Sequence, residues 1–512
     1  MKKLINLIWL LIAVMPVLTA VSGCKKFLDR KPLGSATEGD LTQGGVEGKT
    51  FGLYGQLRTV EGMTTFVRFW FQNIRSDDAV KGSTTGDLAD AGSSMDNFQY
   101  TKDHWLLNQN WDGHVTFINA TNDVIHDVDS LQLTDPGSIV NKAEARFFRA
   151  FTYFDLVRDY GSVPIYNSKV YSAADGNKAK STVAEVYQFI EDDLNYAAAN
   201  LPSTWPAAYV GRVTKGTANS LLAKVLLQQN KWSAALAKAE EVITSGQYSL
   251  LSNYSNFFKE SGENSSESIF EVQMYENTNG SQKLGNNYNE TQGVRGSGDW
   301  DLGWGFNIPS AAFEASFATG DPRKAATILY SGQPDGIYGR TVPASPPLVH
   351  PYWNKKVYTD IARQQATGDR FSYWLNIRLL RYADVILMAA EAANEVGGVP
   401  NTTKALAWLE MIRARARAGN NTILPPIVAP ITQADLRIAI KKERRAELGM
   451  ENQRFYDLVR WTTNNGLNPA PDGIDAITIL GPSGYLPKNR FYPIPQPVLD
   501  RNNKITQNPD YP

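Results

Sequence analysis

Apolar residues recur at helical spacing in several long stretches of this chain. The first, "KAEARFFRAFTYFDLVRDYGSVPI", begins at Lys142 and places its apolar residues on one face of a helix. These residues are Ala143, Phe147, Ala150, Phe151, Phe154 and Val157. Gly161 and Pro164 follow in the order that is typical of a helix end. A second helix is predicted from an N-cap at Ser181 through "VAEVYQFIEDDLNYAAANLP".

Two later stretches each predict a pair of antiparallel helices. In "TKGTANSLLAKVLLQQNKWSAALAKAEEVITSGQYSL" a break at Gln229-Asn230 separates two apolar stripes. The stripes are Ala218, Leu222, Val225 and Leu226, then Trp232, Ala235, Ala239 and Val242. "LRYADVILMAAEAANEVGG" and "NTTKALAWLEMIRARARAG" repeat the arrangement, and their small residues loosely fit the tetratricopeptide pattern. Since one hairpin cannot bury its own face, stacked copies are expected to share a core. Unrelated helical hairpins are the alternative on periodicity alone.

The helical blocks cover about 141–250 and 376–465, and the segment of about 277–373 between them has another character. It is rich in Gly, Asn and Pro with interspersed aromatic residues, as in "GSGDWDLGWGFN" and "TVPASPPLVHPYW". A long irregular segment is usually either functional or disordered, and the aromatic content argues against disorder. The sequence therefore predicts a mostly α fold, a tetratricopeptide-like helical-repeat scaffold with long irregular ligand-binding loops and little β structure.

The N-terminus carries the pattern of a secretory leader. Lys2 and Lys3 precede an apolar run over 4–21, and small residues lead into Cys24, the only cysteine of 512 residues. "VSGC" is also similar to the lipobox of bacterial lipoproteins, in which the cysteine is acylated and becomes the first residue. We therefore expect a lipoprotein signal peptide over 1–23, a polar tether over 24–45 and one domain through 24–512. An ordinary signal peptide with an incidental cysteine is the alternative.

Composition and motifs exclude several classes of function. The net charge of −1 gives no electrostatic footprint for nucleic acid. The four histidines show no metal-ligand spacing, and neither a nucleophile elbow nor a phosphate-binding loop is present. We therefore predict no cofactor, no metal and no catalytic residue. Adjacent Asp77 and Asp78 on a strand point to opposite sides, a poor arrangement for a glycosidase. The charges from Glu443 to Arg460 are interpreted as solvated ion pairs on a helix.

Four blocks, in order, resemble the signatures of the SusD/RagB family of outer-membrane nutrient-binding lipoproteins. They are the Lys142 block, "LRYADVILMAAEAANE", "ERRAELGMENQRFYDLVRW" and "FYPIPQPVLDRNNKITQNPDY". "TGDPRK" at 319–324 and the residues after Cys24 are also similar to family elements. The resemblance implies four tetratricopeptide-like units, lipid anchoring in the outer membrane with exposure at the cell surface, and a SusC-like TonB-dependent barrel as partner.

A sugar ring needs an aromatic face for its C–H groups and polar side chains for its hydroxyls. Trp304, Trp300 and Asp301 on the glycine-rich loop meet this description. Trp304 also stands where the resemblance implies a stacking aromatic, ahead of Asp321-Pro322-Arg323. The second-rank candidates are Tyr288, Trp353, Trp70 and Asp78, with Trp105 as a substitute for a missing downstream tryptophan.

Together with the resemblance, these features predict a non-enzymatic protein that captures oligosaccharides and delivers them to the barrel. Two alternatives remain open at this point. One is a peptide-binding lid or a purely structural repeat scaffold, and the other is a surface carbohydrate-active enzyme, which lacks a convincing catalytic pair.

Overall fold

The structure is a computed structural model that describes residues 45–58, 63–274, 287–367 and 374–512. The chain divides into two compact units, Met1–Lys49 and Thr50–Pro512. Cys24, the predicted leader and the predicted tether up to residue 44 lie outside the described residues. The second unit contains the helical scaffold and all the candidate ligand-binding residues. Helix α3 (Gly45–Gln56) spans the limit between the units.

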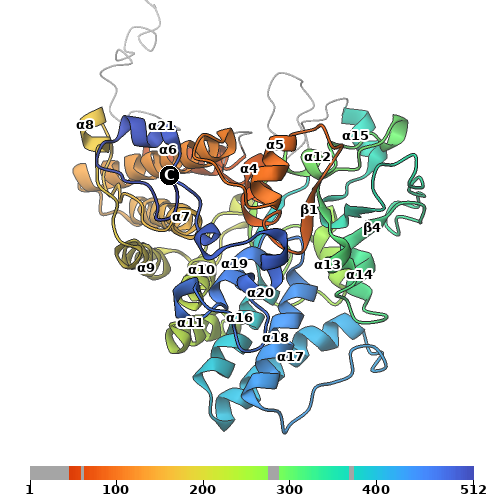
Figure 1. The fold of residues 1–512 in the computed structure, drawn as a ribbon. Helices are drawn as coiled ribbons and strands as arrows, with labels where there is room; N and C mark the ends of the chain where they lie inside the picture. The colour runs from red at the N-terminus through yellow and green to blue at the C-terminus, as the bar shows by residue number, and fades with distance from the viewer. Residues whose placement is uncertain (1–44, 59–62, 275–286, 368–373) are drawn as a thin grey trace, which may run out of the picture. The chain divides into compact units, whose positions relative to one another are not determined.

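Long helices form the scaffold, and each packs on the next along the chain (Figure 1). Helix α6 packs on α7, α7 on α9, α9 on α10 and α10 on α11, and α16 contacts α11, α17 and α18. Their bounds are α6 Trp105–Ser130, α7 Pro136–Tyr160, α9 Val183–Asn200, α10 Lys215–Gln228, α11 Trp232–Thr244, α16 Tyr382–Val396, α17 Val399–Arg417 and α18 Gln433–Leu448. The predicted mostly α fold is confirmed.

The two predicted hairpins form as the apolar stripes require. Ala218 of α10 and Ala239 of α11 are fully buried, as are Ala389 of α16 and Ala405 of α17, so small residues stand where the paired helices approach. The predicted N-cap at Ser181 is off by one residue. Thr182 caps α9 instead, because its hydroxyl accepts from the Glu185 amide and the Glu185 carboxylate accepts from the Thr182 amide.

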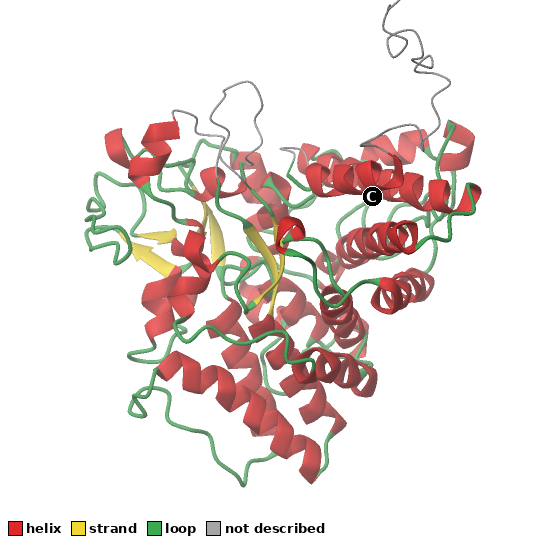
Figure 2. Cartoon of the chain, turned by 180° about the vertical axis from the view of Figure 1, so that it is seen from behind, coloured by secondary structure: helices red, strands yellow, loops and turns green. Residues whose placement is uncertain are grey.

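Short strands and helices occupy the described parts of the segment that the sequence predicts to be irregular. Three two-stranded antiparallel sheets form, and Figure 2 shows their strands beside the helical scaffold. The pairs are β1 (Ala79–Gly82) with β3 (Phe306–Pro309), β2 (Ser268–Val272) with β6 (Ile377–Arg381), and β4 (Ile328–Tyr330) with β5 (Tyr352–Asn354). The pairs β1–β3 and β2–β6 join segments that are distant in the sequence, whereas β4 and β5 are connected by the single stretch 331–351, which is therefore held at both ends.

Short α-helices of four to seven residues, together with the three-residue α5, connect these elements along with several 3-10 helices. The short α-helices are α4 Phe66–Gln72, α5 Ala89–Ala91, α8 Ala173–Gly176, α12 Tyr288–Gln292, α13 Ala311–Glu314, α14 Pro322–Thr327, α15 Ile361–Thr367, α19 Arg454–Arg460, α20 Ala476–Leu480 and α21 Gln496–Arg501. Among the described residues, no helix combines the length and the apolar character that crossing a bilayer requires.

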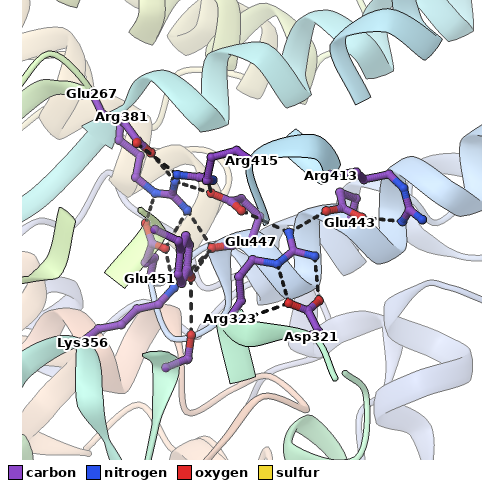
Figure 3. Close-up of polar contacts among 12 residues, drawn as sticks. Glu267, Asp321, Arg323, Lys356, Arg381, Arg413, Arg415, Glu443, Glu447 and Glu451 are labelled. Carbon is purple, nitrogen blue, oxygen red and sulfur yellow. Dashed lines mark hydrogen bonds and ion pairs between the residues drawn. The ribbon is translucent and has the colours of Figure 1, made fainter. Parts of the chain in front are cut away.

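A buried ion-pair cluster joins α18 to the strands and loops around it (Figure 3). Glu447 accepts from Arg381 at 2.7 Å, from Arg323 at 3.1 Å and from Arg415. The remaining members are Glu267, Asp321, Lys356, Arg413, Glu443 and Glu451. The interpretation of the Glu443–Arg460 charges as solvated pairs is therefore wrong for this helix. Glu443 and Glu447 are buried, because residues four apart share one helix face, and this face meets arginines of α14, α17 and β6.

The cluster holds Glu447 in its charged form. Burial opposes ionisation, but the guanidinium groups of Arg415, Arg381 and Arg323 outweigh it and hold the pKa of Glu447 well below its usual range. Removing one member of a buried pair leaves an uncompensated charge, which costs about 3–5 kcal/mol. Loss of the Glu447 carboxylate alone is therefore expected to weaken the contacts that α18 makes with α14, α17 and β6.

We expect Glu447→Gln to lower the free energy of unfolding by about 3–5 kcal/mol at pH 7, because three buried guanidinium groups lose their shared carboxylate. Urea unfolding followed by circular dichroism measures this difference. Glu240→Gln is the matched control, since Glu240 pairs with half-exposed Lys404 at the surface, and its effect should stay below about 1 kcal/mol. An equal effect of the two substitutions would contradict this role of the cluster.

The stability that Glu447 contributes is expected to depend on pH. Because the folded-state pKa of Glu447 is depressed, its stabilising contribution is complete above the unfolded pKa of about 4.3 and is lost as the pH falls below that value. The stability difference between the wild type and Glu447→Gln should therefore stay constant from pH 8 to about 5.5 and shrink towards pH 4. A difference that grows on acidification would contradict the assignment.

Candidate functional site

The glycine-rich loop that carries Trp304 is fixed by its backbone. The amide of Trp304 donates to the Glu290 carbonyl at 3.1 Å, and the amide of Gly305 donates to the Gly293 carbonyl at 2.9 Å. Any Cβ at position 303 would overlap the Glu290 carbonyl oxygen, and Gly305 has a φ of +68°. Only glycine fits these two positions without strain, so the sequence "GWG" presents the tryptophan on a rigid turn.

Trp304 is exposed, with 40% of its surface accessible. Arg295 lies over its ring, with 5.5 Å between the guanidinium carbon and the ring centroid. Arg295 is itself held by Asp87 at 3.0 Å and by the Ser83 hydroxyl at 3.3 Å. The tryptophan therefore stands beside a polar loop from another part of the chain, which brings hydrogen-bonding groups next to an exposed ring.

Trp300 and Asp301 lie on the same loop with different surroundings. The Trp300 ring stacks on Tyr358, with centroids 6.3 Å apart and planes 1° from parallel, and packs against a buried apolar cluster. Asp301 is exposed, and its backbone bridges to that of Arg295. Trp300 thus anchors the loop with one face, while Asp301 and Trp304 are turned to solvent.

The structure places the other four predicted residues inside the protein. Trp70 and Trp353 are fully buried, Trp70 against Phe306 and Trp353 as part of the apolar cluster under the loop. Tyr288 is buried, and its hydroxyl accepts from the Asn452 amide at 2.8 Å. These aromatic side chains support the site from beneath, and no ligand reaches them from solvent in this conformation.

Asp78 is also buried, and the expectation that it meets sugar hydroxyls is not supported. Its carboxylate accepts from Arg445 at 2.7 Å, while Asp77 pairs with Arg454 at 2.8 Å and with Arg445 at 2.8 Å. Burial raises the pKa of Asp78 in spite of Arg445, whereas Arg454 and Arg445 outweigh burial and lower the pKa of Asp77. Both carboxylates hold α18 and α19 to the start of β1.

Trp105, which the sequence gives only as a substitute, is the second exposed tryptophan among the described residues, at 41%. It stands at the first position of α6 and stacks on Phe66, with ring centroids 6.2 Å apart. Phe66 contacts buried Trp70, and Trp70 contacts Phe306, two residues after Trp304. A row of ring contacts therefore runs from exposed Trp105 to buried Phe306, which lies two residues after Trp304 in the sequence. Spacing alone does not reveal it, because the row draws on three separate segments.

The arrangement suits binding and offers little for acid–base chemistry. Hydrogen bonds from Thr84 and Ser83 outweigh partial burial and lower the pKa of Asp87, so this carboxylate is ionised at neutral pH and cannot donate a proton to a leaving group. Within the described ranges, no group of three His, Cys, Asp or Glu side chains could hold a metal ion. An exposed ring bordered by Arg and Asp can stack on a sugar face and bond its hydroxyls.

Comparison with known families gives two matches along the chain. A family model described as "SusD family" matches residues 241–511, and one described as "Starch-binding associating with outer membrane" matches residues 63–227. A SusD-like protein of Formosa agariphila is 27% identical over 479 residues, covering 86% of this chain and 89% of that protein. A SusD-like protein of Bacteroides ovatus is 26% identical, covering 85% and 79%.

Solved structures share the fold over nearly its whole length. A laminarin-binding SusD-like protein superposes with a TM-score of 0.74 at 28% identity, covering 91% of this chain and 99% of that one. Surface glycan-binding protein A of Bacteroides thetaiotaomicron, solved with laminarihexaose, gives a TM-score of 0.71 at 22% identity, covering 90% and 98%. At that identity the second likeness concerns the fold alone.

Replacing Trp300 and Trp304 one at a time should show which ring stabilises the loop and which one is exposed without stabilising it. We expect Trp300→Ala to lower the free energy of unfolding by about 2 kcal/mol, because it removes the stack on Tyr358 and the packing on the apolar cluster. Trp304→Ala should cost less than about 1 kcal/mol, since its ring is exposed to solvent and a contact such as that with Arg295 contributes little at an exposed site. Equilibrium unfolding in urea measures both, and a larger cost for Trp304→Ala would contradict its assignment as the solvent-facing residue.

Proposed function

Because the chain belongs to the SusD family, we propose that it is a non-enzymatic lipoprotein that captures oligosaccharides and delivers them to a SusC-like TonB-dependent barrel in the outer membrane. The observation that carries the sugar-binding part is Trp304, an exposed ring on a backbone-fixed turn beside Arg295 and Asp87. Such a ring stacks on the C–H face of a sugar, while the flanking charges bond its hydroxyls.

The proposed glycan contact runs from Trp304 along the loop to Asp301, with Trp300 as its support. Trp105 is the second proposed stacking residue for a longer chain of sugars, because the row of ring contacts that starts at Trp105 ends at Phe306, two residues after Trp304. β-Glucans of the laminarin type are the first ligand to test, since a structural neighbour at 28% identity is named for binding laminarin. A tethered receptor raises the local glycan concentration at a barrel, so modest affinity is sufficient.

Isothermal titration of the mature chain with laminarin oligosaccharides, malto-oligosaccharides and mixed peptides tests the proposed ligand. We expect one glycan class to bind and Trp304→Ala to weaken its binding at least about tenfold, because an aromatic ring that a ligand covers carries a large share of the binding energy. Tyr171→Ala is the matched control, since it also removes an exposed aromatic ring, 68% accessible, from another loop. Binding of peptides alone, or glycan binding that survives Trp304→Ala, would contradict the proposed site.

The anchor and the barrel partner rest on Cys24 and on the family. Expressed in a Gram-negative host with a labelled fatty acid, the wild type should carry the label and partition into detergent, and Cys24→Ser should do neither. A TonB-dependent barrel should copurify with the wild type from detergent-solubilised outer membranes of its natural host. A wild type without the label would contradict lipid attachment at Cys24. A preparation without a barrel would contradict the proposed delivery of glycans to a TonB-dependent transporter.

A further inference from the structure

A separate cavity lies beside the loop that carries Ile337 and Tyr338. Its volume is about 420 Å³, within the range of small-molecule sites, and Tyr254, Phe258, Ile337 and Lys355 contribute to its lining. Tyr338, one residue along, packs against Tyr358, on which Trp300 stacks. The cavity and the Trp304 loop are thus connected through Tyr338 and Tyr358 but share no lining residue.

The charge of this cavity is positive. Lys259, Lys355 and Arg415 line it, and no Asp or Glu does. Within the part of the chain that the structure describes, Lys259 and Lys355 have no carboxylate at ion-pair distance. Lys355 donates to the Ala325 carbonyl at 2.8 Å and Lys259 to the Asn256 side chain at 3.1 Å, so each ammonium keeps donors for a further acceptor.

The carboxylates nearest to these cations are already bound. Asp335 is buried and accepts from the amides of Ile337 and Tyr338 and from the Tyr358 hydroxyl, all within 3.2 Å. Arg415 pairs with Glu267 and Glu447 in the ion-pair cluster, yet its buried Nε has no hydrogen-bond acceptor (Figure 3). Burial lowers the pKa of Lys355, Asp335 opposes this and Lys259 adds to it, so the two lysines repel each other.

We propose that this cavity binds a saccharide unit that carries an oxyanion, a carboxylate or a sulfate. The two lysines supply charge-assisted hydrogen bonds to the anion, and Ser252, Asn253 and Ser255 supply polar groups for hydroxyls. Tyr254, Phe258 and Ile337 supply the apolar wall that a ring face requires. An anion between Lys259 and Lys355 also relieves their mutual repulsion.

This site differs in charge from the Trp304 surface. Along that surface, the acidic residues Asp87 and Asp299 face Arg295 and Arg340 at ion-pair distance, and Asp301 adds a further acidic side chain. The lining of the cavity carries cations and lacks acidic side chains. The two sites therefore suit different units, a neutral sugar at Trp304 and an acidic one in the cavity. The proposal does not depend on glycan capture at Trp304, and the variants below separate the two.

Calorimetric titration of the mature chain with glucuronate, glucose 6-sulfate, glucose and inorganic sulfate tests the proposal. We expect the two acidic sugars to bind and glucose not to bind at the same concentrations. The double variant Lys259→Gln/Lys355→Gln should weaken acidic-sugar binding about tenfold or more, because two charge-assisted hydrogen bonds are lost. Lys355→Arg, which keeps the charge, should retain binding within about threefold.

Two controls identify the site. Lys324→Gln removes a lysine of α14 that pairs with Glu314 and does not line the cavity, and it should leave acidic-sugar binding unchanged. Trp304→Ala should also leave it unchanged, whether or not neutral glycans bind at Trp304. Binding that survives the double variant, equal binding of glucose, or inorganic sulfate binding as tightly as the sulfated sugar would each overturn the proposal. Thermal unfolding of every variant verifies that it remains folded.

Discussion

The charges of α18 are the constraint on which the rest of the fold depends. Along this helix, Glu443 and Glu447 bind arginines from α14, α17 and β6, while Arg445 on another face binds Asp77 and Asp78. Its side chains thereby connect the repeat helices, the region around β4 and β5, and the start of β1. Since these segments come from distant parts of the sequence, the ion pairs of this one helix hold together elements that are far apart along the chain.

A chain of contacts connects α18 to the proposed glycan site. Asp77 and Asp78 precede β1, β1 pairs with β3, and β3 begins two residues after Trp304. The loop is held from the other side by Glu290 of α12 and by Trp300 on the apolar cluster. The exposed ring is therefore positioned by buried interactions on both sides, which is the condition for recognition without a large ordering cost.

Periodicity predicts the scaffold well because burial of one helix face leaves a direct record in the sequence, as at Ala218 and Ala239. Periodicity does not predict whether a charged residue is buried. Glu447 and a solvated glutamate occur at the same helical spacing and differ only in what packs against them. The candidate site shows the same limit. "GDWDLGWG" predicts an exposed aromatic loop, but Trp70, Trp353 and Tyr288 lie beneath it, and composition does not separate a supporting ring from an exposed one. Trp105 is linked to the start of β3 only through a row of ring contacts that sequence order hides.

Gly303 determines which substitutions in this loop can change the exposed side chain without moving the backbone. Because its missing side chain lets the turn rest against the Glu290 carbonyl, the direction of residue 304 is set by the main chain and owes little to the ring itself. Exchanging tryptophan for another aromatic at 304 would then change the stacking area without moving the turn. At the proposed glycan site, preference among sugars could therefore be retuned at this one position, while a change at 303 would displace the whole turn.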